Sequence, residues 1–289
     1  MPELPEVETM RRGILSIVGA KIVAAKRTPC SKRPIEIKPR IDRLSKRVAG
    51  KKITAIERLG KRVVVRLETD DRLIFEPRMT GLVLIKDPPT IEHLRFCLEL
   101  KNCKIKKLLF WDRRGLGNVT LFSPVQYQEK LDSGTLGPDA LDVSLEEFCE
   151  RFSNTRREIK VALLDQSAIA GVGNLYASEI LHQAKVDPRT RCDRLSRQQW
   201  EEIFQCMIEI LETAIQYEGS TLSDGTYRNA LNQSGGYQNE HLVYDRAGKK
   251  CIRCRSQVIT RIVQAQRATF FCSKCQKKTR PRSKTKVRN

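Results

Sequence analysis

The chain has 289 residues, enough to bury a sizeable core and to divide into two domains. Its 54 Lys and Arg residues outnumber its 34 Asp and Glu residues, and the formal net charge of +20 favours a polyanionic partner over a basic surface kept only for solubility. No apolar run approaches the roughly 18 residues that a membrane helix needs, and the acidic N-terminus excludes a signal peptide, so we expect an intracellular protein in a reducing compartment with no membrane partner.

The first eight residues, Met-Pro-Glu-Leu-Pro-Glu-Val-Glu, have the composition of a nucleophilic site. If Met1 is removed, the chain begins at Pro2, whose secondary amine can form a Schiff base with a carbonyl-like carbon. The carboxylates of Glu3, Glu6 and Glu8 provide nearby acids or bases. The alternative is an ordinary acidic N-terminus before a helix, with prolines at positions that a first turn permits.

The N-terminal half has the patterns of a strand-rich domain. Val7, Met10 and Ile14 lie on one side of a short helix expected over 6–15. Alternating or short apolar segments, separated by polar turns, then continue to about residue 123. They occupy residues 62–68, 82–85, 94–100 and 105–111. This half is therefore predicted to be a β-sandwich with one helix at its start.

Residues 134–143 have the composition of a linker, and helices are expected after them. Residues 144–147 form a capping-box pattern, and apolar residues at helical spacing over 197–217 indicate a helix that faces the core. The segment 219–240 is rich in Gly, Ser and Asn and has few apolar anchors, which predicts a mobile loop. Residues 277–289 contain seven Lys or Arg and no acid, which predicts a disordered basic tail with non-specific affinity for nucleic acid.

Four of the ten cysteines have the spacing of a zinc site. In Cys251-x2-Cys254-x17-Cys272-x2-Cys275, each pair can place two thiolates on one tight turn, and two such turns complete a closed tetrahedral site. With four cysteine ligands and no open position, the single Zn²⁺ should be structural; a disulfide or redox site is the alternative. Arginines between the pairs, including Arg267, could be presented to phosphates by a β-hairpin.

A glycine turn at Gly171-Val-Gly173 precedes a helix expected to begin near Asn174. The N–H groups and dipole of a helix N-terminus attract phosphate. With Lys160 on the preceding helix, the segment would form a helix–turn–helix phosphate clamp. A Gly-x-Gly turn alone is equally consistent with a plain tight turn, and the zinc-site pattern and the positive charge favour the clamp.

Together these motifs resemble the bacterial formamidopyrimidine-DNA glycosylases, in the family that also contains the endonuclease VIII-like enzymes. The matching segments run from Pro2 to Gln276. They are Met-Pro-Glu-Leu-Pro-Glu-Val-Glu-Thr at 1–9, Leu-Asp-Gln at 164–166, Ala-Gly-Val-Gly-Asn at 170–174, Val243-Tyr244 with Arg246 and Gly248, and Ala-Gln-Arg-Ala-Thr-Phe-Phe-Cys at 265–272. Several independent motifs in the same order argue against a chance match.

The resemblance implies an α+β fold with two domains. The first is an N-terminal β-sandwich with an N-terminal helix, and the second is helical, with a helix-two-turn-helix and a four-cysteine zinc finger. The corresponding division is a catalytic domain (1–133), a linker (134–143), a DNA-binding domain with a lesion-covering loop (144–240), a zinc finger (241–276) and the basic tail (277–289). The implied partner is damaged double-stranded DNA, bound by a monomer in the cytoplasm and associated with the nucleoid.

The implied activity is that of a bifunctional DNA glycosylase and AP lyase of base excision repair, acting on 8-oxoguanine and formamidopyrimidines. After loss of Met1, Pro2 would attack C1′ of the damaged nucleotide and expel the base. The resulting Schiff base would lead to strand cleavage by β,δ-elimination. Glu3 would act as the acid/base at the sugar, Glu6 would help to hold the lesion site, and Lys61 would contact the DNA and the lesion.

Other residues correspond to contacts around an extruded base. The gap left in the duplex would be filled by Met79, Arg114 and Leu116, because apolar wedges and an arginine suit a site with stacked walls and an orphan base. Taken without the resemblance, Met79 and Leu116 would be assigned to the core or to turns. The residues implied to bind phosphates near the lesion are Lys160, Asn174 and Arg267.

The chain departs from the family pattern at three places, of which the first affects the wedge and the third affects lesion choice. Leu116 stands where this branch usually has Phe, Glu76-Pro77 replaces the usual His-Leu, and the loop at 220–224 has Ser where a basic residue is usual. Two alternative functions remain at this point. One is an endonuclease VIII-like glycosylase for oxidised pyrimidines, and the other is a zinc-finger DNA-binding protein without catalytic activity.

Overall fold

The computed structural model describes residues 2–277, and the rest of the expected basic tail lies outside the described residues. The contacts divide the chain into two units, which are described separately. Unit one extends to Leu136 and resumes at Glu212–Glu240, whereas unit two comprises Gly137–Leu211 and continues from His241. Helix α7 (Arg197–Gln216) contributes residues to both units. No helix in the described part of the chain is long and apolar enough to cross a membrane.

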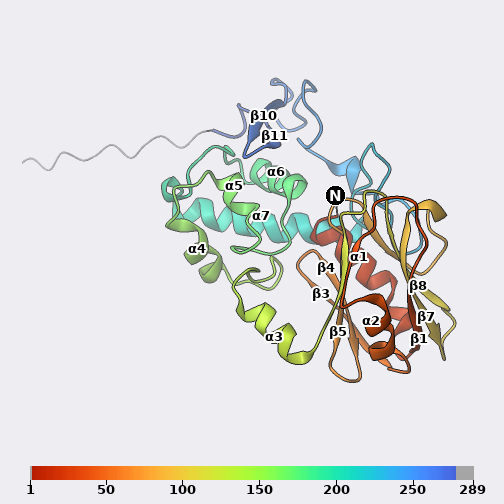
Figure 1. The fold of residues 1–289 in the computed structure, drawn as a ribbon. Coiled ribbons are helices and arrows are strands. Elements are labelled where there is room, and N and C mark those ends of the chain that lie inside the picture. Colours follow the sequence, from red (N-terminus) through yellow and green to blue (C-terminus); the bar gives the residue numbers. More distant parts are fainter. Residues whose placement is uncertain (1, 278–289) are drawn as a thin grey trace, which may run out of the picture. The chain divides into compact units, whose positions relative to one another are not determined.

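Unit one is a sandwich of two β-sheets (Figure 1). Its strands are β1 (Lys21–Arg27), β2 (Glu36–Lys38), β3 (Ile53–Leu59), β4 (Arg62–Leu67), β5 (Arg72–Glu76), β6 (Gly81–Leu84), β7 (Leu94–Lys101), β8 (Lys107–Asp112) and β9 (Asn118–Phe122). One sheet has the order β1-β7-β8-β6, and the other has the order β2-β9-β5-β4-β3. Neighbouring strands are antiparallel except for β2 and β9.

The two sheets share one apolar core. Phe75 from β5 contacts Phe96 from β7 and Phe110 from β8, with ring centroids 5.8 and 5.7 Å apart. Helix α1 (Leu4–Gly13) adds Val7 and Met10, which are completely buried in this core. Burial of these side chains fixes α1 against β3 and β4 of one sheet and β6 of the other. The N-terminal turn before α1 is therefore held by the core of unit one.

Unit one contains two helices that the sequence interpretation missed, since it predicted only the first. Helix α2 (Ile41–Val48) contacts β1 and β2. Helix α3 (Pro124–Asp132) begins with a reciprocal capping box, in which Ser123 and Gln126 each accept a hydrogen bond from the other's backbone N–H. The Ser-Pro-x-Gln pattern was the available signal for α3.

The segment 219–240 is better anchored than its composition suggested. Tyr227 and Ala230 are buried in the core of unit one, with 4% and 1% of their surfaces exposed. The Tyr227 hydroxyl donates a hydrogen bond to the Glu218 carbonyl at 3.0 Å. The apolar anchors are few, as expected, but they are buried, because isolated apolar residues in a polar segment contact a core formed elsewhere in the chain.

Unit two is helical and contains a β-hairpin. Its elements are α4 (Leu145–Ser153), α5 (Ile159–Leu163), α6 (Asn174–Gln183), the part of α7 up to Leu211, β10 (Thr260–Gln264) and β11 (Arg267–Phe271). Ser144 caps α4 by accepting the Glu147 N–H at 3.2 Å. The Glu147 carboxylate pairs with Arg151 instead of completing the capping box. With the sandwich of unit one, these elements confirm the predicted α+β class.

Candidate active site and metal centre

The N-terminal turn places three of the predicted site residues together in unit one. Pro2 and Glu3 precede α1 and are buried, and Glu6 follows in its first turn with 2% of its surface exposed. One carboxylate oxygen of Glu6 accepts the Glu3 N–H at 2.8 Å, and the other accepts the Ser220 N–H at the same distance. Glu6 therefore joins the N-terminal turn to the segment 219–240.

A second carboxylate on α1 organises a cluster of arginines. Glu8 accepts hydrogen bonds from Arg11, Arg12 and Arg58 at 2.7–3.1 Å. Burial by itself raises the pKa of Glu8, but the hydrogen bonds and charges of these arginines outweigh it and lower the pKa from 4.5 to about 2. The carboxylate is therefore ionised at neutral pH.

The same cluster supports the turn that carries Lys61. Gly60 and Lys61 form the two-residue connection between β3 and β4, and Gly60 has a φ of +55°. Glycine adopts this conformation without strain, as the hairpin turn requires. Arg58 donates to the Gly60 carbonyl at 3.3 Å and to Glu8 at 3.1 Å. A chain of polar contacts thus joins Lys61's turn to α1.

The three residues predicted to fill the gap left by an extruded base lie on two loops of unit one, which we call the filler loops. Met79 is on the turn between β5 and β6, and 36% of its surface is exposed. Arg114 and Leu116 lie between β8 and β9, where Arg114 is exposed and Leu116 is half-buried. Arg78, beside Met79, has a φ of +52°, which is strained for a residue with a side chain.

In unit two, Lys160 is completely buried. Its ammonium donates to Asn174 Oδ1 at 2.6 Å, to Thr269 Oγ1 at 2.8 Å and to the Ala268 carbonyl at 3.0 Å. The Asn174 amide donates to the same Ala268 carbonyl at 3.0 Å. Lys160 therefore joins α5, the start of α6 and strand β11 through one buried charge.

Arg267 begins β11, directly before Ala268, and is exposed. The turn before it consists of Ala265 and Gln266, whose φ values are +45° and +61°. Two positive φ values match the hairpin turn that usually contains Asn-Gly, so this turn carries backbone strain. The turn places Arg267 at the accessible tip of the hairpin.

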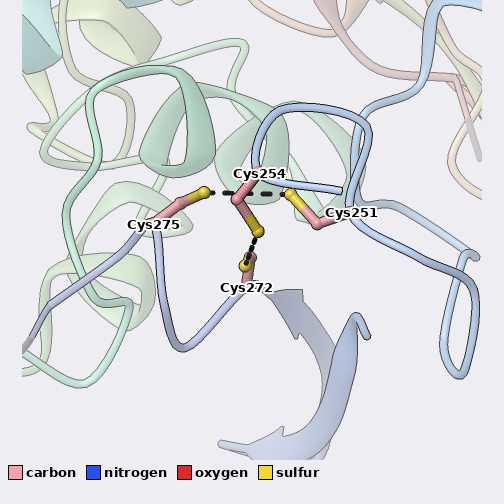
Figure 2. Close-up of side chains that lie close together, drawn as sticks. All are labelled: Cys251, Cys254, Cys272 and Cys275. Atoms are coloured by element: carbon pink, nitrogen blue, oxygen red, sulfur yellow. Dashed lines mark hydrogen bonds between the residues drawn. The ribbon is translucent and has the colours of Figure 1, made fainter. Parts of the chain in front are cut away.

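The four cysteines of the predicted zinc site converge in unit two (Figure 2). All four sulfur atoms lie within 4.8 Å of one another, with Cys251 and Cys275 3.8 Å apart and Cys254 and Cys272 3.7 Å apart. A tetrahedron with Zn–S bonds of about 2.3 Å has sulfur–sulfur edges of about 3.8 Å. This geometry and four thiol ligands fit one structural Zn²⁺, as the sequence predicted.

The segment around the cysteines is also held by hydrogen bonds outside the cysteine cluster. The buried Glu179 carboxylate on α6 accepts the N–H groups of Leu242, Val243 and Tyr244 at 2.7–3.0 Å. The Gln276 amide donates to the Val186 carbonyl at 2.9 Å. Both ends of the cysteine-bearing segment are therefore bound to the helical part of unit two.

Comparison with known proteins identifies the family. Models described as the formamidopyrimidine-DNA glycosylase N-terminal domain, its H2TH domain and the zinc finger found in FPG and IleRS match residues 1–119, 136–226 and 248–278. A formamidopyrimidine-DNA glycosylase from Chloroflexus aurantiacus is 38% identical over 281 residues, covering 96% of this chain and 98% of the relative. The chain belongs to the formamidopyrimidine-DNA glycosylase family.

Solved structures agree with this family assignment. A Lactococcus lactis FPG mutant in complex with DNA containing Fapy-dG is 34% identical, with a TM-score of 0.85, over 96% of this chain and all of that one. The Lactococcus lactis Fpg in complex with DNA containing an abasic site has a TM-score of 0.84 at 33% identity, with the same coverage. The MutM (Fpg) protein from Thermus thermophilus has a TM-score of 0.83 at 31% identity, covering 96% and 99%.

Within this family fold, each unit gathers its own predicted site residues. Unit one holds Pro2, Glu3, Glu6 and Lys61 together with the filler loops, and unit two holds Lys160, Asn174, Arg267 and the cysteines. The sequence interpretation missed Arg58 and Glu179, and it named Glu8 only as a nearby acid or base and not as the centre of an arginine cluster. The partner of Arg58 lies far away in the sequence, and Glu179 accepts from backbone groups, so no local motif marks these two residues. Glu8 has a local signal, because Arg11 and Arg12 follow it at helical spacing.

Proposed function

We propose that this chain is a bifunctional DNA glycosylase and AP lyase of base excision repair that removes oxidised purines from duplex DNA. The observation that carries the proposal is the N-terminal turn, where Pro2 and Glu3 lie side by side directly before α1, a helix held by a buried core. Relatives that share the fold bind DNA containing Fapy-dG or an abasic site. Damaged double-stranded DNA is accordingly the proposed partner.

The chemistry begins when Met1 is removed and the Pro2 nitrogen becomes a secondary amine. This amine attacks C1′ of the damaged nucleotide, the C1′–N bond to the base breaks, and the base leaves with its bonding electrons and a proton. The sugar ring opens as the iminium forms at C1′. Loss of the C2′ proton then expels the 3′ phosphate, and a second elimination expels the 5′ phosphate. Glu3 exchanges protons at the sugar as general acid and base.

The other residues bind and shape the DNA. Lys61 contacts the DNA and the lesion, and Glu6 keeps the N-terminal turn in place through Glu3 and Ser220. Met79, Arg114 and Leu116 fill the gap left by the extruded base. Leu116 is smaller than an aromatic residue and offers a weaker stacking surface. We therefore expect it to stack less strongly on the orphan base than a Phe would.

For Lys160 we propose a different role from the phosphate contact that the resemblance implied. Its ammonium is completely buried and donates to three oxygen atoms of the protein. Lys160 thereby orients Asn174 and the Ala268 segment, and the direct phosphate contacts belong to Asn174 and to the exposed Arg267. Lys160 is thus a positioning residue of the DNA-binding surface.

The Schiff base provides the test. Borohydride should reduce it to a stable amine and trap a covalent complex on duplex DNA that contains 8-oxoguanine or an abasic site. Pro2→Gly, or an N-terminal tag that remains attached, should weaken or abolish trapping. Protein whose Met1 removal has been verified, yet which forms no trapped complex on either substrate, would sink the enzymatic proposal and leave a DNA-binding protein without catalysis.

The lesion preference needs a parallel measurement. Duplexes with an oxidised pyrimidine should be processed much more slowly than duplexes with 8-oxoguanine at equal protein concentration. The relatives are named for formamidopyrimidine, which supports the purine branch. Faster release of the oxidised pyrimidine would instead assign the chain an endonuclease VIII-like specificity.

A further inference from the structure

Thr80 and Asp112 join the two filler loops of unit one. Thr80 follows Met79 directly, and Asp112 ends β8 and begins the loop that carries Arg114. Both side chains are buried, with 3% and 0% of their surfaces exposed. The Thr80 hydroxyl donates to Asp112 Oδ1 at 2.5 Å. This contact connects two turns that are separated by β6 and two further strands in the sequence.

The Asp112 carboxylate also organises its own loop. Its Oδ1 accepts the Arg114 N–H at 3.2 Å, and its Oδ2 accepts the Gly117 N–H at 2.7 Å. The Arg114 N–H is shared with Thr80 Oγ1 at 3.0 Å. Hydrogen bonds to a buried carboxylate are stronger than those between neutral groups, and a buried carboxylate left without its donors is costly. The two loops are therefore held by one hydrogen-bonded group.

The backbones of both loops have little room to move. A Cβ atom at Gly81 would lie 2.5 Å from Pro77 Cα, and one at Gly117 would lie 2.8 Å from the Glu76 carbonyl oxygen. The buried guanidinium of Arg95 donates to the Asp112 carbonyl at 2.8 Å. Close backbone packing at the glycines and the hydrogen bonds of Asp112 together fix the loops that carry Met79, Arg114 and Leu116.

We propose that Thr80 and Asp112 form a brace that makes the two filler loops one rigid body, so that all three filler side chains enter the duplex together. The inference rests on the proposed function, because it assigns the brace to the base-extrusion step of that reaction. Side chains held at fixed separations before binding lose less conformational entropy when they insert. Thr80 and Asp112 act through the fillers and are positioning residues.

Loss of the brace should affect two substrates differently. An 8-oxoguanine nucleotide must be extruded from the stack before its C1′ can be attacked, whereas an abasic site has no base to extrude. Loss of the brace should therefore slow excision of 8-oxoguanine and leave cleavage at an abasic site nearly unchanged. Thr80→Val removes the hydroxyl at nearly constant volume, and Thr80→Ser keeps the hydroxyl. Thr54→Val, at an exposed position of β3, is the control for a threonine-to-valine change.

The experiment measures single-turnover excision and abasic-site cleavage on matched duplexes, with the thermal unfolding midpoint of each variant. We expect Thr80→Val to lower the 8-oxoguanine excision rate about 10- to 100-fold, as loss of a hydrogen bond to a charged group would. Abasic-site cleavage should change less than about threefold, within the scatter of single-site effects. Thr80→Ser and Thr54→Val should retain both activities. A fluorescent 2-aminopurine opposite the lesion should show less unstacking with Thr80→Val.

Three results would overturn the brace. In the first, Thr80→Val excises 8-oxoguanine as fast as the wild type. In the second, a folded Thr80→Val loses both activities equally, which would place the residue in the chemical step. In the third, Thr80→Ser loses as much excision activity as Thr80→Val. A wild-type protein that processes neither substrate would overturn the proposed function itself, and the brace with it.

Discussion

The carboxylate of Glu6 accepts the backbone N–H of Ser220 at 2.8 Å, across 214 positions of the sequence. Gly219, just before Ser220, has a φ of +77°, and a Cβ atom there would lie 2.8 Å from Glu6 Oε1. The N-terminal turn and the segment 219–240 therefore meet at a point where an added Cβ atom would force the Glu6 side chain to shift.

Substitution of Gly219 tests this contact. Gly219→Ala should reduce both stability and 8-oxoguanine excision, because it adds a steric clash with Glu6 to the cost of a positive φ. Gly225→Ala is the matched control, since Gly225 lies in the same segment with a φ of +61° but has open space around it. We expect Gly219→Ala to be less stable than Gly225→Ala by about 1–3 kcal/mol in urea unfolding. Equal effects of the two substitutions would mean that the Glu6 contact can relax.

The Glu8 cluster predicts a pH dependence of stability. The pKa of Glu8 is lowered in the folded state from 4.5 to about 2, so its contribution is fully present above pH 4.5 and is lost as the pH falls towards 2. The contribution is at most about 3 kcal/mol, and less because Arg12 is 57% exposed.

Glu8→Gln should therefore be less stable than the wild type at pH 7, with a smaller difference between them at pH 3. Urea unfolding at both pH values measures this. Glu68→Gln, at an exposed position of the same unit, should leave stability unchanged at pH 7. A stability gap between Glu8→Gln and the wild type that stays constant from pH 7 to pH 3 would contradict the assigned pKa.

The buried position of Lys160 predicts an unusual salt dependence of DNA binding. A side chain that contacts a phosphate contributes about 0.9 to the slope of log affinity against log salt. Arg267→Ala should lower that slope by about one, because Arg267 is exposed. Lys160→Met should weaken binding without changing the slope, because Lys160 acts through Asn174 and Ala268. The measurement is the DNA affinity of each variant at several salt concentrations. A lower slope for Lys160→Met would mean that Lys160 contacts a phosphate directly.

The zinc centre has a neighbour that the sequence did not indicate. His182 on α6 is buried, and its Nε2 lies 3.6 Å from the Cys251 sulfur. Groups that hydrogen-bond to metal ligands typically change metal affinity 10- to 100-fold when they are removed. His182→Ala should therefore release zinc at about 10-fold lower concentrations of a competing chelator. His93→Ala in unit one is the control, and equal zinc retention by the two variants would exclude a role for His182.

Sequence patterns predicted the features that depend on residues close together in the chain. The alternation over 62–68 predicted the strand β4, because successive side chains of a strand point to opposite faces, although Val63, Val64 and Val65 are all buried. The two Cys-x2-Cys pairs predicted zinc because each pair can form a single turn. The burial of Lys160 could not be predicted, because it depends on Thr269, which is 109 residues away. The same holds for Tyr227 and Ala230, whose partners in the core belong to other segments.

The hydrogen bonds of Glu179 and Gln276 affect how the chain rebinds zinc after it has lost the ion. They hold one end of the cysteine-bearing segment to α6 and the other to Val186, just after α6, which lowers the entropy cost of bringing the sulfur atoms together. A chain that loses its ion would then keep a partly assembled site. We expect such a chain to recover by simple re-metallation, without complete refolding of unit two.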